Sequence, residues 1–276
     1  MKKIVKTFLI GSLIGLYFSL YFIGLGSDVN FSDIVIKCAF GVHDISYHEI
    51  ISISMELFSI LILVFLYGND IYKRFCIASV YFFSRCTNRI RWFVKESIVL
   101  FINVFLYVLI IPTSCMIIAC INNNNIFDIG SIGLYIYYLL IYTFYLYSIV
   151  LGTNILAIKL GSVKGFSIIT IFLLSSVTLV TLWEKIFPLV ISDEVTLEMV
   201  MKNGELLKFN PITHLILKWH TSIIPEINEK IGFFLIEYDL NCSLITSVIL
   251  FFTIYLVSVF VIKRLDLVML CKEMED

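Results

Sequence analysis

Six long apolar stretches constrain the fold of this chain more than any other feature. A helix crosses the ~30 Å hydrocarbon core of a membrane with about 20 apolar residues, and each stretch approaches or exceeds that length. Backbone polar groups find no water in lipid, so only helices and closed barrels span it. Because these stretches are continuously apolar rather than alternating, they predict helices and not barrel strands. They cover residues 7–26, 50–68, 97–120, 129–158, 166–183 and 242–262.

The composition agrees with this interpretation. The chain is 60% hydrophobic and 15% charged, whereas soluble domains carry roughly 45–50% apolar and about 25% charged residues. We therefore expect one all-α transmembrane domain over residues 1–276, a multi-pass protein of the cell (plasma) membrane. The first stretch follows a basic N-terminus, as a signal peptide does, but it is longer than the usual h-region and no small-residue cleavage site follows. We expect it to stay as an uncleaved helix.

The placement of positive charge predicts the orientation. If both termini are cytoplasmic, most of the 20 Lys and Arg residues face the cytoplasm, as the positive-inside rule requires. Residues 72–96 are then a cytoplasmic segment between the second and third spans, and residues 184–241 are an outer loop between the fifth and sixth. This loop is expected to be structured. Asn203-Gly204 is a hairpin signal, and NPITHLILKWH, from Asn210, predicts a short helix capped by that residue with one apolar face.

The segment 72–96 gathers basic residues among aromatic ones. Helical spacing predicts an amphipathic helix in its first part, with Phe75 and Phe82 on one side. Two interpretations stay open at this point: a membrane-surface helix on anionic headgroups, and a docking helix for a soluble partner, for which the planar arginine fork is well suited. Trp92 lies where an aromatic residue of the membrane interface belongs. The basic residues are Lys73, Arg74, Arg85, Arg89, Arg91 and Lys95.

Three short sequences carry a resemblance to a known family. SRCTNRIRWFVK (84–95) resembles the segment that follows the coupling helix in permease subunits of type-2 ABC exporters. KLGSVKG (159–165) is similar to the second cytoplasmic contact of that family, and NPITH, from Asn210, is similar to permeases of low-GC Gram-positive bacteria. Together with six spans, cytoplasmic termini and a long outer loop before the sixth span, they resemble the bacteriocin or peptide export and immunity-like subfamily.

The resemblance implies a permease subunit that moves peptide, antibiotic or lipid-like cargo. Its partners would be an ABC ATPase subunit, a second permease copy or a related subunit, and membrane lipid, with no nucleic acid. The chain has no GxxxxGK[ST] loop, so Mg-ATP is expected in the partner. We expect no cofactor, no catalytic residue and no enzymatic activity in this chain. The implied ATPase-coupling interface is Arg74, Phe75, Tyr81, Phe82, Arg85, Arg89 and Arg91, with Trp92 and Lys95 as membrane-interface anchors.

Polar residues inside the spans are the other candidates. Glu56 is the one acidic residue well inside a span, and a charged group there is a functional candidate by default. Lining of a substrate pathway and structural capping both remain open for it. Asn103 and the tyrosine stripe of the fourth span, with Tyr138 and Tyr142, are further pathway candidates. Two alternatives stay open: Asn103 and Asn154 as residues that bond across helices, and the stripe as a packing surface, which is the commoner use of aromatic stripes. We expect no metal site. The alternative functions are a non-transporting membrane assembly or immunity protein and an intramembrane enzyme.

Overall fold

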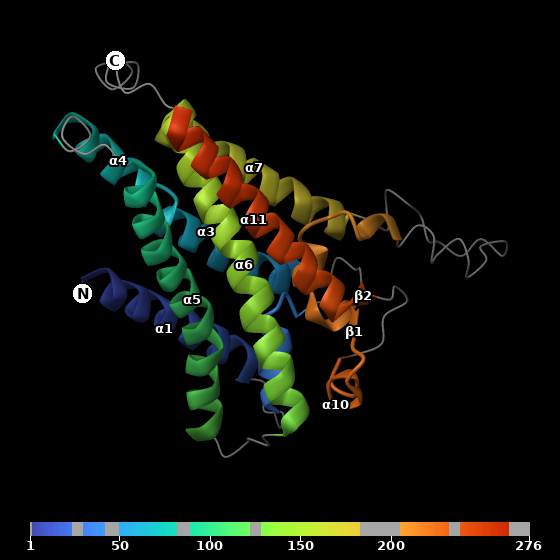
Figure 1. Ribbon diagram of the computed structural model, residues 1–276. Coiled ribbons are helices and arrows are strands. Elements are labelled where there is room, and N and C mark those ends of the chain that lie inside the picture. Colours follow the sequence, from blue (N-terminus) through green and yellow to red (C-terminus); the bar gives the residue numbers. More distant parts are fainter. Residues whose placement is uncertain are drawn as a thin grey trace.

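The computed structural model describes residues 2–23, 30–41, 50–81, 89–121, 128–182, 205–231 and 238–264 (Figure 1). Helices dominate it, and the two short strands pair in parallel. The elements are α1 (Lys2–Ile23), α2 (Phe31–Lys37), α3 (Ile50–Tyr67), α4 (Asp70–Tyr81), α5 (Arg89–Ile121), α6 (Ile129–Leu160), α7 (Ser162–Thr181), the 3-10 helices η2 (Thr213–Leu215) and η3 (Leu217–Trp219), β1 (His220–Thr221), α10 (Pro225–Asn228), β2 (Tyr238–Asp239) and α11 (Leu240–Arg264).

Six helical segments among the described residues are long and apolar enough to cross a membrane. The expected all-α polytopic architecture is confirmed at this level. The segments are Lys3–Leu20, Ile53–Phe75, Arg89–Ile121, Ile129–Leu160, Ser162–Thr181 and Leu240–Arg264.

Two boundaries differ from the expectation. Helix α5 begins at Arg89 rather than near residue 97, so the last part of the expected cytoplasmic segment forms the first turns of this helix. The second candidate span continues through the Gly68-Asn69 turn into α4. Hydropathy marks where a helix leaves lipid, but the backbone stays helical until a residue interrupts its hydrogen bonds. No glycine or proline does so between Arg89 and Ser97.

Helix α6 is the centre of the bundle (Figure 1). It contacts α2, α3, α4, α5, α7, α10 and α11, and it has the largest buried share of the six candidate spans. Its sequence is apolar or aromatic on all sides, which is the pattern of a helix that is surrounded by others. Side chains of α6 can therefore bond to most of the other elements.

Two glycines let neighbouring helices approach closely. Helix α1 packs on α5, where a Cβ on Gly15 would lie 2.6 Å from Ser114 Cβ and 2.7 Å from the carbonyl oxygen of Ile111. Helix α7 meets α6 at Gly165, where a Cβ would lie 2.6 Å from the backbone nitrogen of Ala157. Small residues at such crossings are typical of membrane helix packing. The stretch GSLIG (11–15) carries this signal in the sequence.

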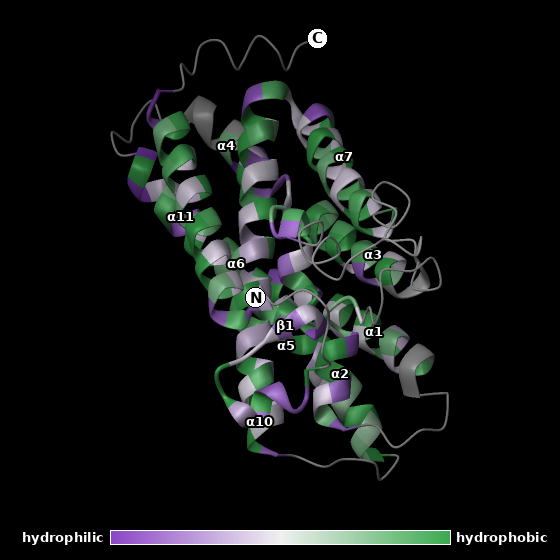
Figure 2. Cartoon of the chain, turned by 90° about the vertical axis from the view of Figure 1, so that its right-hand side faces the viewer, coloured by the Kyte–Doolittle hydropathy of each residue, from purple (hydrophilic) through white to green (hydrophobic). Residues whose placement is uncertain are grey.

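Polar residues gather at the two ends of the bundle and apolar residues along its length (Figure 2). One end, called the basic end below, contains the start of α1, helix α4, the start of α5, the α6–α7 junction and the end of α11. An ion pair of 2.6 Å between Lys3 Nζ and Asp70 Oδ2 joins α1 to α4 there. The opposite end contains α2, the start of α6, residues 205–231, both strands and the start of α11. Asp128 Oδ2 and Lys230 Nζ pair there at 2.6 Å.

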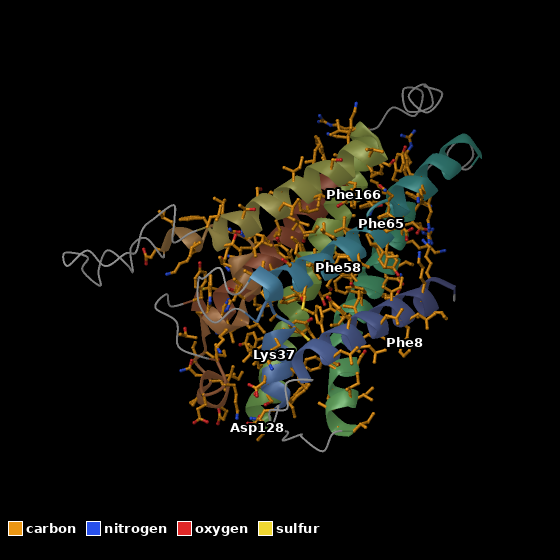
Figure 3. All side chains as sticks on the ribbon, turned by 180° about the vertical axis from the view of Figure 1, so that it is seen from behind. Phe8, Lys37, Phe58, Phe65, Asp128 and Phe166 are labelled. Carbon is orange, nitrogen blue, oxygen red and sulfur yellow. The ribbon has the colours of Figure 1, made fainter. Side chains whose placement is uncertain are left out.

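Large apolar side chains cover the outside of the bundle. Phe8 of α1 and Phe58 and Phe65 of α3 are exposed, Phe65 to 75%, and all three are labelled in Figure 3. Exposed Ile, Leu and Phe residues also cover α7 and α11. Such a surface is unfavourable in water and favourable in a lipid solvent.

The segment NPITHLILKWH corrects one expectation. Asn210 Oδ1 accepts a hydrogen bond of 3.0 Å from the backbone nitrogen of Ile212, but the two 3-10 helices η2 and η3 follow instead of an α-helix. The residues of the expected apolar face are buried inside the chain: Ile212, Leu215, Ile216 and Trp219. Thr213 and Leu217 are buried as well, and a one-sided α-helix could not bury them all. The expected hairpin at Asn203-Gly204 lies outside the described residues.

Candidate functional site

One side chain of α6 fixes the junction between α3 and α4. Asn154 is buried, and its Oδ1 accepts hydrogen bonds from the backbone nitrogens of Ile71 (2.7 Å) and Tyr72 (3.3 Å). Its Nδ2 donates to the carbonyl oxygen of Tyr67 at 2.8 Å. Helix starts leave N–H groups unsatisfied and helix ends leave C=O groups unsatisfied. Asn154 satisfies groups of both kinds, so it ties α4 and α3 to α6.

Helix α4 is also fastened to α5. Arg74 forms an ion pair with Glu96, and the ring of Phe75 packs on that of Trp92 with centroids 5.9 Å apart. Phe75 is only 1% exposed, so it packs α4 against α5 rather than facing outward. Trp92 is half-buried. Together with the ion pair between Lys3 and Asp70, helix α4 thus has side-chain contacts to three spans, α1, α5 and α6, besides its covalent link to α3.

The basic end carries an excess of positive charge among the described residues. The acidic side chains described there, Asp70 and Glu96, are both in ion pairs. A surface with this charge attracts anionic partners or headgroups. The cationic side chains described there are Lys3, Lys6, Lys73, Arg74, Arg89, Arg91, Lys95, Lys159, Lys164, Lys263 and Arg264.

The structure brings together only part of the expected coupling interface. Arg91 and Lys95 are exposed and Arg89 is half-exposed, all in the first turns of α5, and Arg74 reaches α5 from α4. Of the remaining expected residues, the side chain of Tyr81 and all of Phe82 and Arg85 lie outside the described residues.

Asn103, expected either to line a pathway or to bond across helices, bonds helices to one another. It is buried, and Thr7 Oγ1 of α1 donates to its Oδ1 at 3.1 Å. Its Nδ2 donates to the carbonyl oxygen of Val99 at 2.7 Å. The same Thr7 hydroxyl bonds to the hydroxyl of Tyr67, so α1, α3 and α5 are linked in one polar layer. Interhelical hydrogen bonds of this kind hold membrane bundles together.

Glu56 lies inside the bundle, on α3. The residue is 4% exposed, and its Oε2 has no hydrogen-bond partner among the described residues. One turn further on, the carbonyl oxygen of Ser59 accepts a hydrogen bond of 2.8 Å from the Tyr107 hydroxyl. Glu56 interacts electrostatically with Cys115 of α5 and with tyrosines of α5 and α6: Tyr107, Tyr138 and Tyr142.

The tyrosines of α6 form a buried stripe. Tyr138 and Tyr142 are both buried, with ring centroids 4.4 Å apart, and Tyr135 stacks on Tyr138 at 6.4 Å. The hydroxyl of Tyr142 donates to the carbonyl oxygen of Leu215 at 3.1 Å. The stripe therefore bonds α6 to the structured segment at the opposite end.

A histidine pair, which sequence reasoning missed, lies at the opposite end. Ser243 Oγ is 2.9 Å from His214 Nδ1 and 2.7 Å from His220 Nε2. The other ring nitrogens face carbonyl oxygens, of Lys208 at 3.0 Å and Ile216 at 2.8 Å, so they carry the ring protons. Burial lowers the pKa of His220 to about 4 and also lowers the pKa of His214. Both rings are therefore neutral at pH 7, and Ser243, with a single proton, donates to one of them.

These three residues carry no common motif, and they lie far apart in the sequence. Their proximity depends on how residues 205–231 fold back onto the start of α11. In the same region the Lys230 ammonium and Ser131 hold the pKa of Asp128 at about 2. Asp128 also accepts from the backbone nitrogen of Ser131 at 2.8 Å, so it caps α6. In Figure 3, Asp128 and Lys37 mark this end of the molecule.

No group of three or more His, Cys, Asp or Glu side chains that could hold a metal ion occurs in the part of the chain that the structure describes. Comparisons of the chain with protein-family models, curated proteins and solved structures found no match.

Proposed function

We propose that this chain is the membrane-spanning permease subunit of an ATP-driven ABC exporter of peptide, antibiotic or lipid-like cargo. A separate partner chain would bind and hydrolyse Mg-ATP. The permease would work with a second copy or a related subunit in the cell membrane, with both termini and the basic end in the cytoplasm. The observation that carries the proposal is the attachment of α4: a short basic helix at one end of the bundle, bonded to the spans α1, α5 and α6 and continuous with α3.

This attachment suits a helix that transmits force. A partner that moves α4 would act on α6 through Asn154 and on α5 through the pair of Arg74 and Glu96. The spans would respond as semi-rigid rods, because their backbone hydrogen bonds are internal. ATP-dependent closure of the partner would shift the permease between two conformations only if the closed partner binds them with different affinity.

The charge of the basic end supports docking of a protein. In this proposal the interface comprises Arg74, Tyr81, Phe82, Arg85, Arg89 and Arg91. Its arginines contact carboxylates of the ATPase, which arginine can pair bidentately. Phe75 keeps α4 in place on α5. Trp92 and Lys95 anchor the start of α5 at the membrane interface.

The test is purification of the full chain from its native membranes in a mild detergent, with mass spectrometry of the co-purifying proteins. We expect a stoichiometric ATPase, and we expect the double variant Arg89→Glu, Arg91→Glu to lose it while still inserting in the membrane. The matched control is Lys263→Glu, Arg264→Glu, which reverses two exposed charges at the same end on α11. It should retain the ATPase.

Two results would contradict the proposal. No nucleotide-binding chain in several detergents would indicate a stand-alone membrane protein, such as an assembly or immunity protein. Equal losses in the two double variants would indicate that the basic end attracts anions in general, as a lipid-binding surface does, without a specific docking helix.

A further inference from the structure

Residues 210–220, called the strap below, are bonded to three candidate spans at the opposite end. Asn210 Nδ2 donates to the carbonyl oxygen of Ser176 on α7 at 2.7 Å. The hydroxyl of Tyr142, on α6, donates to the carbonyl oxygen of Leu215 at 3.1 Å. The third attachment, to the start of α11, is the histidine pair. Each attachment joins the strap to a different span, so loss of one of them changes how that span is held.

The attachment to α11 is short of one hydrogen atom. His214 Nδ1 and His220 Nε2 lie 2.9 Å and 2.7 Å from Ser243 Oγ. Both nitrogens are acceptors, because the other ring nitrogens donate to the carbonyl oxygens of Lys208 and Ile216. The hydroxyl group has one proton to donate, so one of the two ring nitrogens receives none. An added proton would complete the hydrogen bonds, provided that the surroundings stabilise its charge.

The described surroundings of the pair do not stabilise a positive charge. His220 is 2% exposed, and Ser243 is fully buried. The ring of Tyr238 packs on both histidines, with its centroid 5.8 Å from that of His214 and 5.6 Å from that of His220. The Lys208 ammonium lies over the same tyrosine ring, 5.8 Å from its centroid. A charge of the same sign as a histidinium is therefore present beside the pair.

The neighbouring carboxylates are bonded to other groups. Glu205 Oε1 is 3.5 Å from Lys208 Nζ, and Asp239 Oδ1 accepts a hydrogen bond of 3.2 Å from the backbone nitrogen of Asn241. The three spans bonded to the strap, α6, α7 and α11, contain no Asp or Glu. Burial therefore lowers the pKa of both histidines, and no carboxylate among the described residues opposes it.

We propose that the histidine pair is an acid-sensitive latch, in which protonation of His214 and His220 releases the strap from Ser243 at the start of α11. In the latched state two charged rings would lie on either side of one hydroxyl group, whereas in the released state water hydrates them. The strap keeps its bonds to α6 and α7, so release loosens α11 from both. This inference goes beyond the proposed function. Only the placement of the latch on the outer side of the membrane rests on the orientation proposed above.

The size of the effect follows from proton linkage. The pKa of His220 is about 4 in the latched state, against about 6.5 for a hydrated ring. The released state therefore takes up the proton first as the pH falls. For this ring alone, the ratio of latched to released chains should fall roughly tenfold for each pH unit between these two values.

The test is hydrogen–deuterium exchange of the full chain in lipid nanodiscs without any partner, followed by mass spectrometry of its peptides. Exchange is measured at pH 7 and pH 5 and corrected for the effect of pH on amide exchange itself. Peptides that cover the strap should lose at least tenfold of their protection at pH 5. Peptides from the middle of α6 should stay protected, because neighbouring helices and lipid exclude water from them.

Two double variants assign the effect. His214→Gln, His220→Gln removes both titrating rings, and its strap should exchange equally at the two pH values. The matched control is His43→Gln, His48→Gln, which replaces the other two histidines of the chain and should keep the loss of protection. The same loss in both double variants would overturn the inference.

The unchanged chain decides the inference even if the His214→Gln, His220→Gln chain does not fold. Equal or greater protection of the strap at pH 5 would overturn it, and so would equal losses in the strap and in α6, which indicate general unfolding. The result is independent of the ATPase test. Acid release without a co-purifying ATPase would reject the exporter and keep the latch, and the reverse result would reject the latch alone.

Discussion

The basic end and the opposite end of the bundle are held together by different kinds of contact. At the basic end, α4 depends on the Asn154 amide, on partly exposed ion pairs and on one aromatic pair. At the opposite end, residues 212–219 bury several large apolar side chains, and the histidine pair and Tyr142 add buried hydrogen bonds. Polar point contacts can be broken and remade, whereas close-packed interiors resist deformation.

The energies of the two kinds of contact differ accordingly. Burial of one large apolar side chain contributes about 1.5–3 kcal/mol, while a partly exposed ion pair contributes roughly 0–1 kcal/mol. The comparison indicates that α4, at the basic end, can change its contacts at a lower cost in free energy than the packed segment at the opposite end can. Four predictions test it.

The largest effect is expected at the opposite end. Trp219 is 1% exposed, and Trp219→Ala should lower the free energy of unfolding by about 3–5 kcal/mol, because it leaves a cavity. Thermal and denaturant unfolding of the detergent-solubilised chain would measure this. Phe209→Ala is the control, since Phe209 is 86% exposed on the same segment, and it should have little effect on stability. Similar losses in the two variants would show that the segment is not a packed unit.

The next effect concerns the strongest contact of the basic end. Asn154→Leu leaves three backbone groups, on Tyr67, Ile71 and Tyr72, without their partner, and should cost about 2–4 kcal/mol. Asn103→Leu is the matched control. The Asn103 side chain is also buried, but it bonds to Thr7 and to the carbonyl oxygen of Val99 and not to backbone groups at the end of another helix. Asn103→Leu should cost less and leave binding of the proposed ATPase partner intact, whereas Asn154→Leu should weaken that binding. A larger loss of stability for Asn103→Leu would contradict the role of Asn154 as the residue that ties α3 and α4 to α6.

A third test uses pH and reports on the opposite end. The pKa of His220 is about 4 in the folded chain against about 6.5 in an unfolded one. The unfolded chain therefore takes up the proton first, and the free energy of unfolding should fall by about 2 kcal/mol between pH 7 and pH 5. Equilibrium unfolding at a series of pH values would show the slope, and His220→Gln should flatten it. Greater stability at pH 5 would mean that the two histidines share a proton through Ser243.

The smallest effect is expected for the ion pair of α4 and α5. The side chains of Arg74 and Glu96 are 35% and 14% exposed, so a double-mutant cycle with Arg74→Ala and Glu96→Ala should give a coupling free energy of about 1 kcal/mol. Unfolding of the four chains at low and high salt measures it, and salt should reduce it. A coupling free energy above about 3 kcal/mol, the range of a buried pair, would contradict the comparison. The contacts of the basic end would then be as strong as those of the opposite end.

The candidate site was only partly accessible to sequence reasoning. Glu56 stands out in any hydropathy plot, because a single acid in an apolar span is a local signal. Its missing hydrogen-bond partner is not a local signal, since it depends on which side chains of α5 and α6 face it. The histidine pair had no signal at all, because His214, His220 and Ser243 meet only through the path of the intervening chain.

By itself, the sequence determined the transmembrane architecture and the collection of positive charge in a few segments. Transfer into lipid depends on each stretch's own length and composition, so neighbours are not needed to predict it. The tertiary structure decided which polar side chains meet: Asn154 with the start of α4, Thr7 with Asn103, and the two histidines with Ser243. Those contacts depend on the rotation and crossing of helices, which close approach at Gly15 and Gly165 helps to set.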